Sequence, residues 1–207
     1  MVLAFWSALL LVILLFAKGE PLLYINQFHN AYVDYLFYAI TFLGDGLFAT
    51  IFLIALFLFV SKRKALVITF SFLTVVLVVQ VLKNFWFDTA PRPHTFFEGV
   101  LNVYYVPWIE MHGYNSFPSG HTAQAFCLAL CSLFYLKNKA FALPLFLMAA
   151  FAGFSRLYLM QHFPMDVLGG SLFAILIGTP AFYFFENKMS FLQGIKMDTP
   201  LIQKQKA

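Results

Sequence analysis

Charged side chains are scarce in this chain: its 207 residues include 13 Lys and Arg and 9 Asp and Glu, 11% of the total. A soluble domain carries about 25%. Hydrophobic residues make up 62%, and the mean hydropathy is +0.82. This composition excludes a soluble globular domain, a disordered chain, a collagen-like chain and a nucleic-acid-binding protein. It indicates an integral membrane protein.

Cysteine is nearly absent as well. The 2 cysteines, Cys127 and Cys131, stand four residues apart within one apolar run. A disulfide framework needs paired cysteines in exposed loops, so the sequence predicts no such framework. We expect both to be small hydrophobic residues buried in the membrane, and they carry no information on the redox compartment.

Six apolar runs are present, and a membrane-spanning helix needs about 20 mostly apolar residues. The mixed segment 22–38, with polar residues among Phe, Tyr and Leu, is typical of a helix at the membrane interface. The first run could also be the core of a signal peptide, but it lacks a basic start and a clean cleavage site. We therefore expect an all-α bundle of six transmembrane helices plus the interfacial helix, with spans at Val2–Ala17, Ile40–Val60, Ala65–Leu82, His121–Leu136, Ala140–Leu159 and Asp166–Phe185.

No internal repeat or second domain is visible, so residues 1–207 are expected to form a single membrane domain with a polar tail at 186–207. Positive residues favour the cytoplasmic side of a membrane. With the N-terminus inside, the inner side receives nine Lys and Arg and the outer side four. The pattern predicts a multi-pass protein of the cytoplasmic membrane with a cytoplasmic C-terminus. The inner nine are Lys62, Arg63, Lys64, Lys137, Lys139, Lys188, Lys196, Lys204 and Lys206, and the outer four are Lys18, Lys83, Arg92 and Arg156.

Three polar clusters lie on the predicted outer side, at 83–93, 116–122 and 155–166. Their cations, Lys83, Arg92 and Arg156, stand at span ends, where burying a charge is costly unless something compensates for it. Arg presents a planar fork to phosphate oxygens and Lys a point charge. Ser119 and Gly120 stand where a helix begins, so free backbone N–H groups and the positive end of the helix dipole are expected there. These features predict a pocket for a tetrahedral anion.

Two histidines are candidates for the chemistry. His162 precedes Asp166 by four residues, with Pro164 at the expected first turn of the last span. A carboxylate that is hydrogen-bonded to one ring nitrogen fixes the tautomer of the imidazole and leaves the other nitrogen as a nucleophile. His121, on another span, can then serve as general acid.

Two of these clusters resemble signature motifs of the phosphatidic acid phosphatase type 2 superfamily, over a motif-bearing region of about 40–185. Pro118-Ser119-Gly120-His121 is similar to its second motif, and Ser155-Arg156-x5-His162-x3-Asp166 to its third. Four fixed residues match by chance roughly once in a thousand sequences of this length. The first motif differs: eight residues, rather than six, separate Lys83 from Arg92-Pro93. The longer spacing predicts that the Lys83 ammonium is displaced unless a bulge or an extra turn absorbs it.

The resemblance implies a six-helix phosphatase whose site lies at the outer membrane surface and which removes the terminal phosphate of a lipid phosphate or lipid diphosphate. His162 would attack phosphorus to form a phosphohistidine, Asp166 would orient it, and His121 would protonate the leaving oxygen. Neither a metal nor another cofactor is implied, in keeping with the few carboxylates of the outer loops, which show no two-metal spacing. The residues that would hold the phosphoryl oxygens are Lys83, Arg92, Ser119, Gly120 and Arg156.

Two other functions stay open at this point. A phosphotransferase would use the same phosphohistidine and pass the phosphoryl group to another lipid instead of water. An anion transporter could also gather its substrate with outward cations, but it would not need a His–Asp pair beside a second histidine. The sequence leaves the lipid undetermined among undecaprenyl diphosphate, phosphatidylglycerol phosphate, lipid A phosphates and phosphatidic acid.

Overall fold

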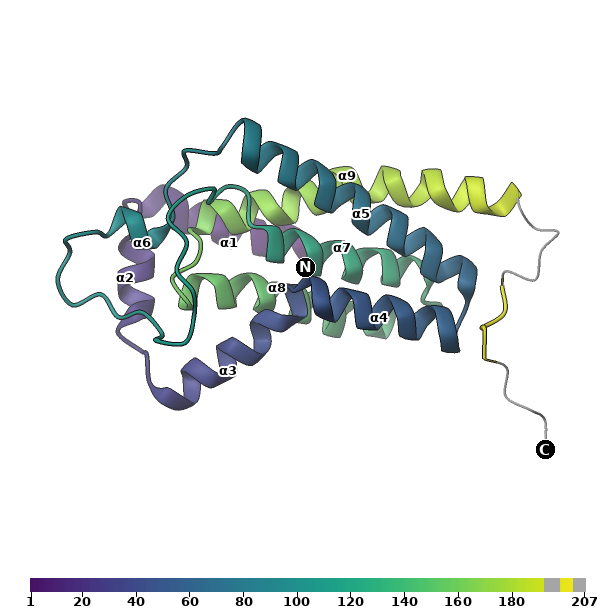
Figure 1. Ribbon diagram of the computed structural model, residues 1–207, viewed down its shortest axis with the longest axis horizontal. Helices are drawn as coiled ribbons and strands as arrows, with labels where there is room; N and C mark the ends of the chain where they lie inside the picture. Colours follow the sequence, from purple (N-terminus) through teal and green to yellow (C-terminus); the bar gives the residue numbers. More distant parts are fainter. Residues whose placement is uncertain (192–197, 203–207) are drawn as a thin grey trace.

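The computed structural model describes residues 1–191 and 198–202, and in these ranges every regular element is helical. The long helices run side by side along the long axis of the molecule, and the short helices α2, α3 and α6 gather at the end opposite the C-terminal end of α9 (Figure 1). The elements are α1 (Val2–Leu15), α2 (Glu20–Asn26), α3 (Ala31–Thr41), η1 (Phe42–Gly44), α4 (Gly46–Phe59), α5 (Lys62–Phe85), α6 (Pro93–Phe96), α7 (Gly120–Tyr135), η2 (Lys139–Phe141), α8 (Ala142–Tyr158) and α9 (Pro164–Phe191).

Short polar residues set where several helices begin. The Asn30, Asp45, Ser61 and Ser119 side chains each accept a hydrogen bond from a backbone N–H in the first turn of α3, α4, α5 and α7. Such caps satisfy amide donors that have no partner within the helix.

The start of the chain differs from the sequence prediction. Residues 22–38 do not form one interfacial helix, because the chain breaks at 27–30 and Asn30 starts α3 anew. The predicted span 40–60 is bent by 54° where Asp45 begins α4. The α1–α2 pair is bent by 105° around Gly19, whose φ is 99°, a conformation that glycine tolerates.

The described residues contain three helices long and apolar enough to cross a membrane, or up to five if each bent pair counts as one span. The three are Lys62–Phe85, Lys139–Tyr158 and Pro164–Met189. Helix α7 has 16 residues and is about 24 Å long at 1.5 Å per residue, which is shorter than a hydrocarbon core of about 30 Å. The membrane character is therefore supported, while the count of six spans exceeds the three to five found.

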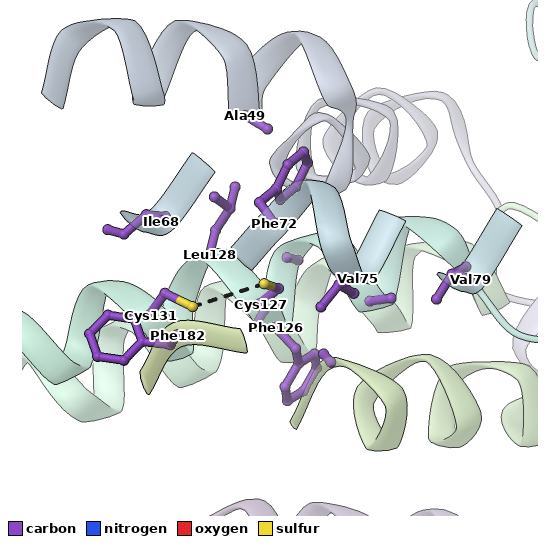
Figure 2. Packing of buried hydrophobic residues seen from close by; sticks show 14 of the residues in the cluster. Ala49, Ile68, Phe72, Val75, Val79, Phe126, Cys127, Leu128, Cys131 and Phe182 are labelled. Carbon is purple, nitrogen blue, oxygen red and sulfur yellow. Dashed lines mark hydrogen bonds between the residues drawn. The ribbon is translucent and has the colours of Figure 1, made fainter. Parts of the chain in front are cut away.

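The core is built around α7, which packs against α5, α8 and α9. Small side chains on α7 allow this close approach: Cys127 and Cys131 are fully buried with their sulfurs 4.0 Å apart, beside Val75 of α5 and Phe182 of α9 (Figure 2). Both cysteines are free, as the sequence predicted.

Glycine lets α9 approach the start of α7. A Cβ at Gly170 would lie 2.4 Å from the Ser119 carbonyl oxygen, and one at Gly169 would lie 2.4 Å from the Phe117 ring. The first turns of α9 therefore lie directly against the loop that leads into α7. This contact brings the second and third polar clusters together.

The predicted polar tail at 186–207 begins later than expected, because α9 continues to Phe191. Glu186 lies within this helix, where Arg63 and Tyr135 both donate hydrogen bonds to its carboxylate. Residues 198–202 run back to α4, where the Leu201 and Ile202 N–H groups bond to Phe57 and Leu58 carbonyl oxygens. Lys196, Lys204 and Lys206 lie outside the described residues.

Candidate active site

The three polar clusters meet where α5 and α8 end and α7 and α9 begin. Lys83 lies in the last turn of α5, Arg156 in the last turn of α8, Ser119 caps α7, and Asp166 is in the first turn of α9. Arg92 reaches the same place from the loop after α5. All five side chains are buried. The fold therefore gathers the residues that the sequence singled out.

His162 and Asp166 form the buried pair that the spacing predicted. The Nδ1 atom of His162 lies 3.3 Å from Oδ2 of Asp166, and Pro164 is the first residue of α9. The same Oδ2 accepts hydrogen bonds from the Phe163 N–H (2.9 Å) and the Ser116 hydroxyl (2.5 Å). The carboxylate is thus held in place, and Nε2 is the ring nitrogen left free of it.

The imidazole of His162 is neutral at ordinary pH. Burial lowers its pKa to about 3, with the nearby Arg92 and Lys83 charges acting in the same direction and Asp166 opposing them. A neutral ring with Nδ1 protonated toward Asp166 carries its lone pair on Nε2. That is the protonation state that a nucleophile needs.

Two guanidinium groups lie on either side of one amide oxygen. Arg92 and Arg156 each donate to Oε1 of Gln161, both at 3.3 Å. Arg92 also donates to the Tyr114 carbonyl oxygen (2.9 Å), and Arg156 to the Thr41 hydroxyl (2.7 Å). Every one of these partners is neutral, so the two positive charges remain uncompensated by a direct ion pair within the described residues.

Lys83 stays at the site despite the longer spacing. Its side chain is buried, and the charges of Arg92, Asp166 and Arg156 all act on it. Between Lys83 and Arg92 the chain completes α5 at Phe85 and then turns: the Ala90 N–H bonds to the Phe87 carbonyl oxygen, and the Ser116 N–H bonds to that of Ala90. The burial of Lys83 and its proximity to these charges agree with the second alternative, in which the chain absorbs the longer spacing.

The start of α7 corrects one expectation. The Ser119 N–H is not free, because it donates to the Asp166 carbonyl oxygen (2.9 Å), a consequence of the close approach of α9. The Ser119 hydroxyl accepts from the Thr122 hydroxyl at 2.9 Å. Gly120, in contrast, has open space where a Cβ would point, so a ligand can approach its backbone.

His121 lies on the same helix start and is partly exposed. Its Nε2 lies 3.8 Å from Oδ2 of Asp45, whose Oδ1 caps α4 by accepting from the Leu47 N–H. Its backbone packs on Gly44, where a Cβ would lie 2.6 Å from the His121 carbonyl oxygen. The second histidine is therefore supported by the α3–α4 bend.

Sequence reasoning missed four side chains at the site. Ser116 and Gln161 stand inside the polar clusters, and this position was the available signal for them. Thr41 and Asp45 come from the distant α3–α4 segment, and no pattern connects them to the clusters. Among the described residues, no group of three or more His, Cys, Asp or Glu side chains is placed to hold a metal ion.

An apolar cavity of about 570 Å³ adjoins Asp166 and Ser116. Its wall is formed by the end of α1, including Val12 and Phe16, and by aromatic residues such as Phe87 and Phe117. The site therefore borders a space in which hydrocarbon would be favourable.

The chain is similar to known proteins in sequence and in structure. The model of the PAP2 superfamily matches residues 64–190. Undecaprenyl-diphosphatase BcrC of Bacillus subtilis is 41% identical over 70 residues, which cover 34% of each chain. Lipid A 4′-phosphatase of Bacteroides thetaiotaomicron is 26% identical over 186 residues, 88% of this chain and 81% of that one.

A solved structure agrees with this match. The crystal structure of Aquifex aeolicus LpxE superimposes with a TM-score of 0.67 and 31% identity, covering 81% of this chain and 96% of that chain.

Proposed function

We propose, since the chain belongs to the PAP2 superfamily, that it is a membrane phosphatase that removes the terminal phosphate of a lipid phosphate or lipid diphosphate through a phosphohistidine. The observation that carries this proposal is the buried His162–Asp166 pair close to three buried cations, Lys83, Arg92 and Arg156. Among the described residues, the side chains of the two arginines bond only to neutral groups. Relatives named as lipid phosphatases support the substrate class.

In the first step, Nε2 of His162 attacks phosphorus as the bond to the leaving oxygen breaks. Asp166 holds the ring through Nδ1 and stabilises the positive charge that develops on it. His121 gives a proton to the leaving oxygen, and a phosphate dianion beside it favours the protonated imidazole that this role requires.

In the second step, water attacks the phosphohistidine and inorganic phosphate leaves. His121, now neutral, takes a proton from the water as the N–P bond breaks, which restores both histidines. The cations Lys83, Arg92 and Arg156 hold the phosphoryl oxygens in both steps. The Gly120 N–H and the Ser119 hydroxyl proton are the donors at the start of α7. We propose that no metal ion takes part.

The substrate is proposed to be held by a membrane because the site borders an apolar cavity. A lipid tail along α1 and the aromatic wall would leave its phosphate near Ser116 and Asp166. The proposed placement is the cytoplasmic membrane, with six spans, the site outside and the C-terminus inside. It follows the distribution of Lys and Arg, with Arg63 and Lys64 at the end opposite the site.

Phosphate release in detergent tests this function. Purified protein should release inorganic phosphate from at least one of undecaprenyl diphosphate, phosphatidylglycerol phosphate, a lipid A phosphate or phosphatidic acid, with EDTA present and no acceptor added. Vanadate should inhibit, because it adopts the trigonal bipyramidal geometry of phosphorus under attack.

Two results would favour the other functions. Phosphate release that needs an added lipid acceptor would indicate a phosphotransferase. No release from any of these lipids, together with accumulation of a phosphorylated solute in vesicles, would indicate a transporter. Loss of activity on chelation, restored by a divalent metal, would contradict the metal-free mechanism.

A further inference from the structure

Gln161 occupies an unusual place for an amide. It immediately precedes His162, and its side chain is 2% exposed. Its single carbonyl oxygen, Oε1, accepts from Arg92 and from Arg156, both at 3.3 Å. The two guanidinium nitrogens therefore lie no farther apart than twice this distance, which is a spacing that one phosphate group can bridge.

The amide also holds the outer loop that precedes α7. Its Nε2 donates to the Glu110 carbonyl oxygen (3.3 Å) and lies 3.1 Å from the Met111 sulfur. Farther back in this loop, the Tyr104 hydroxyl donates to Asp34, and its backbone N–H to Asn26. The loop is thus fixed to α2 and α3 at one point and to the arginine pair at another.

A neutral amide suits this position for an electrostatic reason. Two buried cations this close repel each other, and a carbonyl dipole between them offsets part of that repulsion without cancelling their charge. A carboxylate in the same place would form ion pairs with both guanidinium groups and would compete with the phosphate. An apolar residue would leave the guanidinium groups without their shared acceptor.

We infer that Gln161 is a positioning residue that sets the separation of Arg92 and Arg156 for phosphate and connects that separation to the outer loop. This inference rests on the proposed function, since it assumes that the two arginines bind the phosphoryl group. Gln161 does not touch the substrate itself and acts through the two guanidinium groups.

The experiment compares Gln161→Met with Gln161→Glu. Gln161→Met keeps the side-chain length and removes the acceptor, and misplacement of catalytic groups by about 1 Å costs up to about a hundredfold in rate. We expect a tenfold to hundredfold lower kcat/KM and weaker binding of vanadate. Gln161→Glu should keep the arginines in place and chiefly raise KM, because its charge opposes the incoming phosphate.

A double-mutant cycle with Arg92→Ala separates positioning from a merely structural role. When Arg92 is absent, Gln161→Met should cost much less, since only one guanidinium group remains to be placed. An equal cost in both backgrounds would overturn the inference, and so would wild-type vanadate affinity in Gln161→Met.

Gln124→Met is the matched control. Gln124 lies one turn from His121 on α7, and its buried Oε1 has no hydrogen-bond partner among the described residues. This variant should keep wild-type activity and vanadate affinity. Vanadate binding, measured by calorimetry, does not require turnover. If the wild type binds vanadate but releases no phosphate, the proposed function fails while the positioning role of Gln161 can still be decided.

Discussion

The two ends of the bundle differ in the partners that they give to their cations. At one end, Arg63 pairs with Glu186 and with Asp198, and Tyr135 donates to the same Glu186 carboxylate. At the other, the Arg92 and Arg156 side chains bond to an amide oxygen, a carbonyl oxygen and a hydroxyl, and to no acid among residues 1–191 and 198–202. An acidic partner compensates the charge of a cation. Buried cations with neutral partners keep an uncompensated charge, and this lowers the stability of the fold unless an anion binds. The difference fits a structural role for the first end and the proposed binding of an anionic ligand at the second.

The largest expected effect comes from removing the nucleophile at the site end. His162→Ala should abolish turnover of every substrate, because each of them requires formation of the N–P bond. Phosphate release from lipid and from p-nitrophenyl phosphate measures this loss. Turnover of either substrate by the variant at more than background rate would assign the nucleophile to another residue.

The next effect concerns the three buried cations of the candidate site. Arg92→Ala and Arg156→Ala should each lose about 2–4 kcal/mol of transition-state stabilisation, the scale of one oxyanion donor. Lys83→Ala should lose a similar amount, because Lys83 is buried and the charges of Arg92 and Arg156 act on it. The measurement is kcat/KM for one lipid. A loss at Lys83 of less than about tenfold would mean that the ammonium does not reach the phosphate.

Removing Arg63, the paired cation at the opposite end, should lower stability and leave activity nearly unchanged. Arg63→Ala should change kcat/KM less than about twofold, since Arg63 contacts no site residue. It should lower the free energy of unfolding by about 1–3 kcal/mol, because it takes a hydrogen-bond partner from the half-buried Glu186 carboxylate. Thermal unfolding in detergent measures the change. A large loss of activity with unchanged stability would erase the distinction between the two ends.

The sequence predicted which candidate residues the fold brings together better than it predicted the segments that support them. His162 and Asp166 are four residues apart, and Ser119 starts a helix, so short-range patterns were sufficient to identify them. Thr41 and Asp45 reach the site only because α3 and α4 bend back to it. The Ser119 N–H donates to the Asp166 carbonyl oxygen because α9 packs closely at Gly170. No local sequence pattern encodes that packing.

For the apolar helices too, the sequence predicted local features, such as where a helix begins and ends, better than how the helices are arranged. The spans near α5, α8 and α9 were predicted to within a few residues, except that α9 extends six residues farther at its C-terminal end, to Phe191. Periodicity and length carry this information. The sequence did not predict the change of direction between α1 and α2 or the bend at Asp45, because hydropathy does not encode the angle between two helices.

The smallest expected effect is a pH dependence confined to the site end. Burial lowers the pKa of His162 to about 3, whereas an unfolded histidine titrates near 6.5. Below about pH 6.5 the unfolded chain therefore binds a proton at this position that the folded chain does not, so stability contributed here is lost as pH falls toward 3. The loss is at most about 1.4 kcal/mol per pH unit. Unfolding free energies of the wild type and of His162→Gln between pH 6.5 and 5 should show this difference, with the wild type falling more steeply. In parallel, ¹⁵N resonances of His162 should not shift between pH 8 and 5. A titration of the ring in that range would mean that the site is more hydrated than its burial implies, and that the pair with Asp166 holds an imidazolium even without substrate.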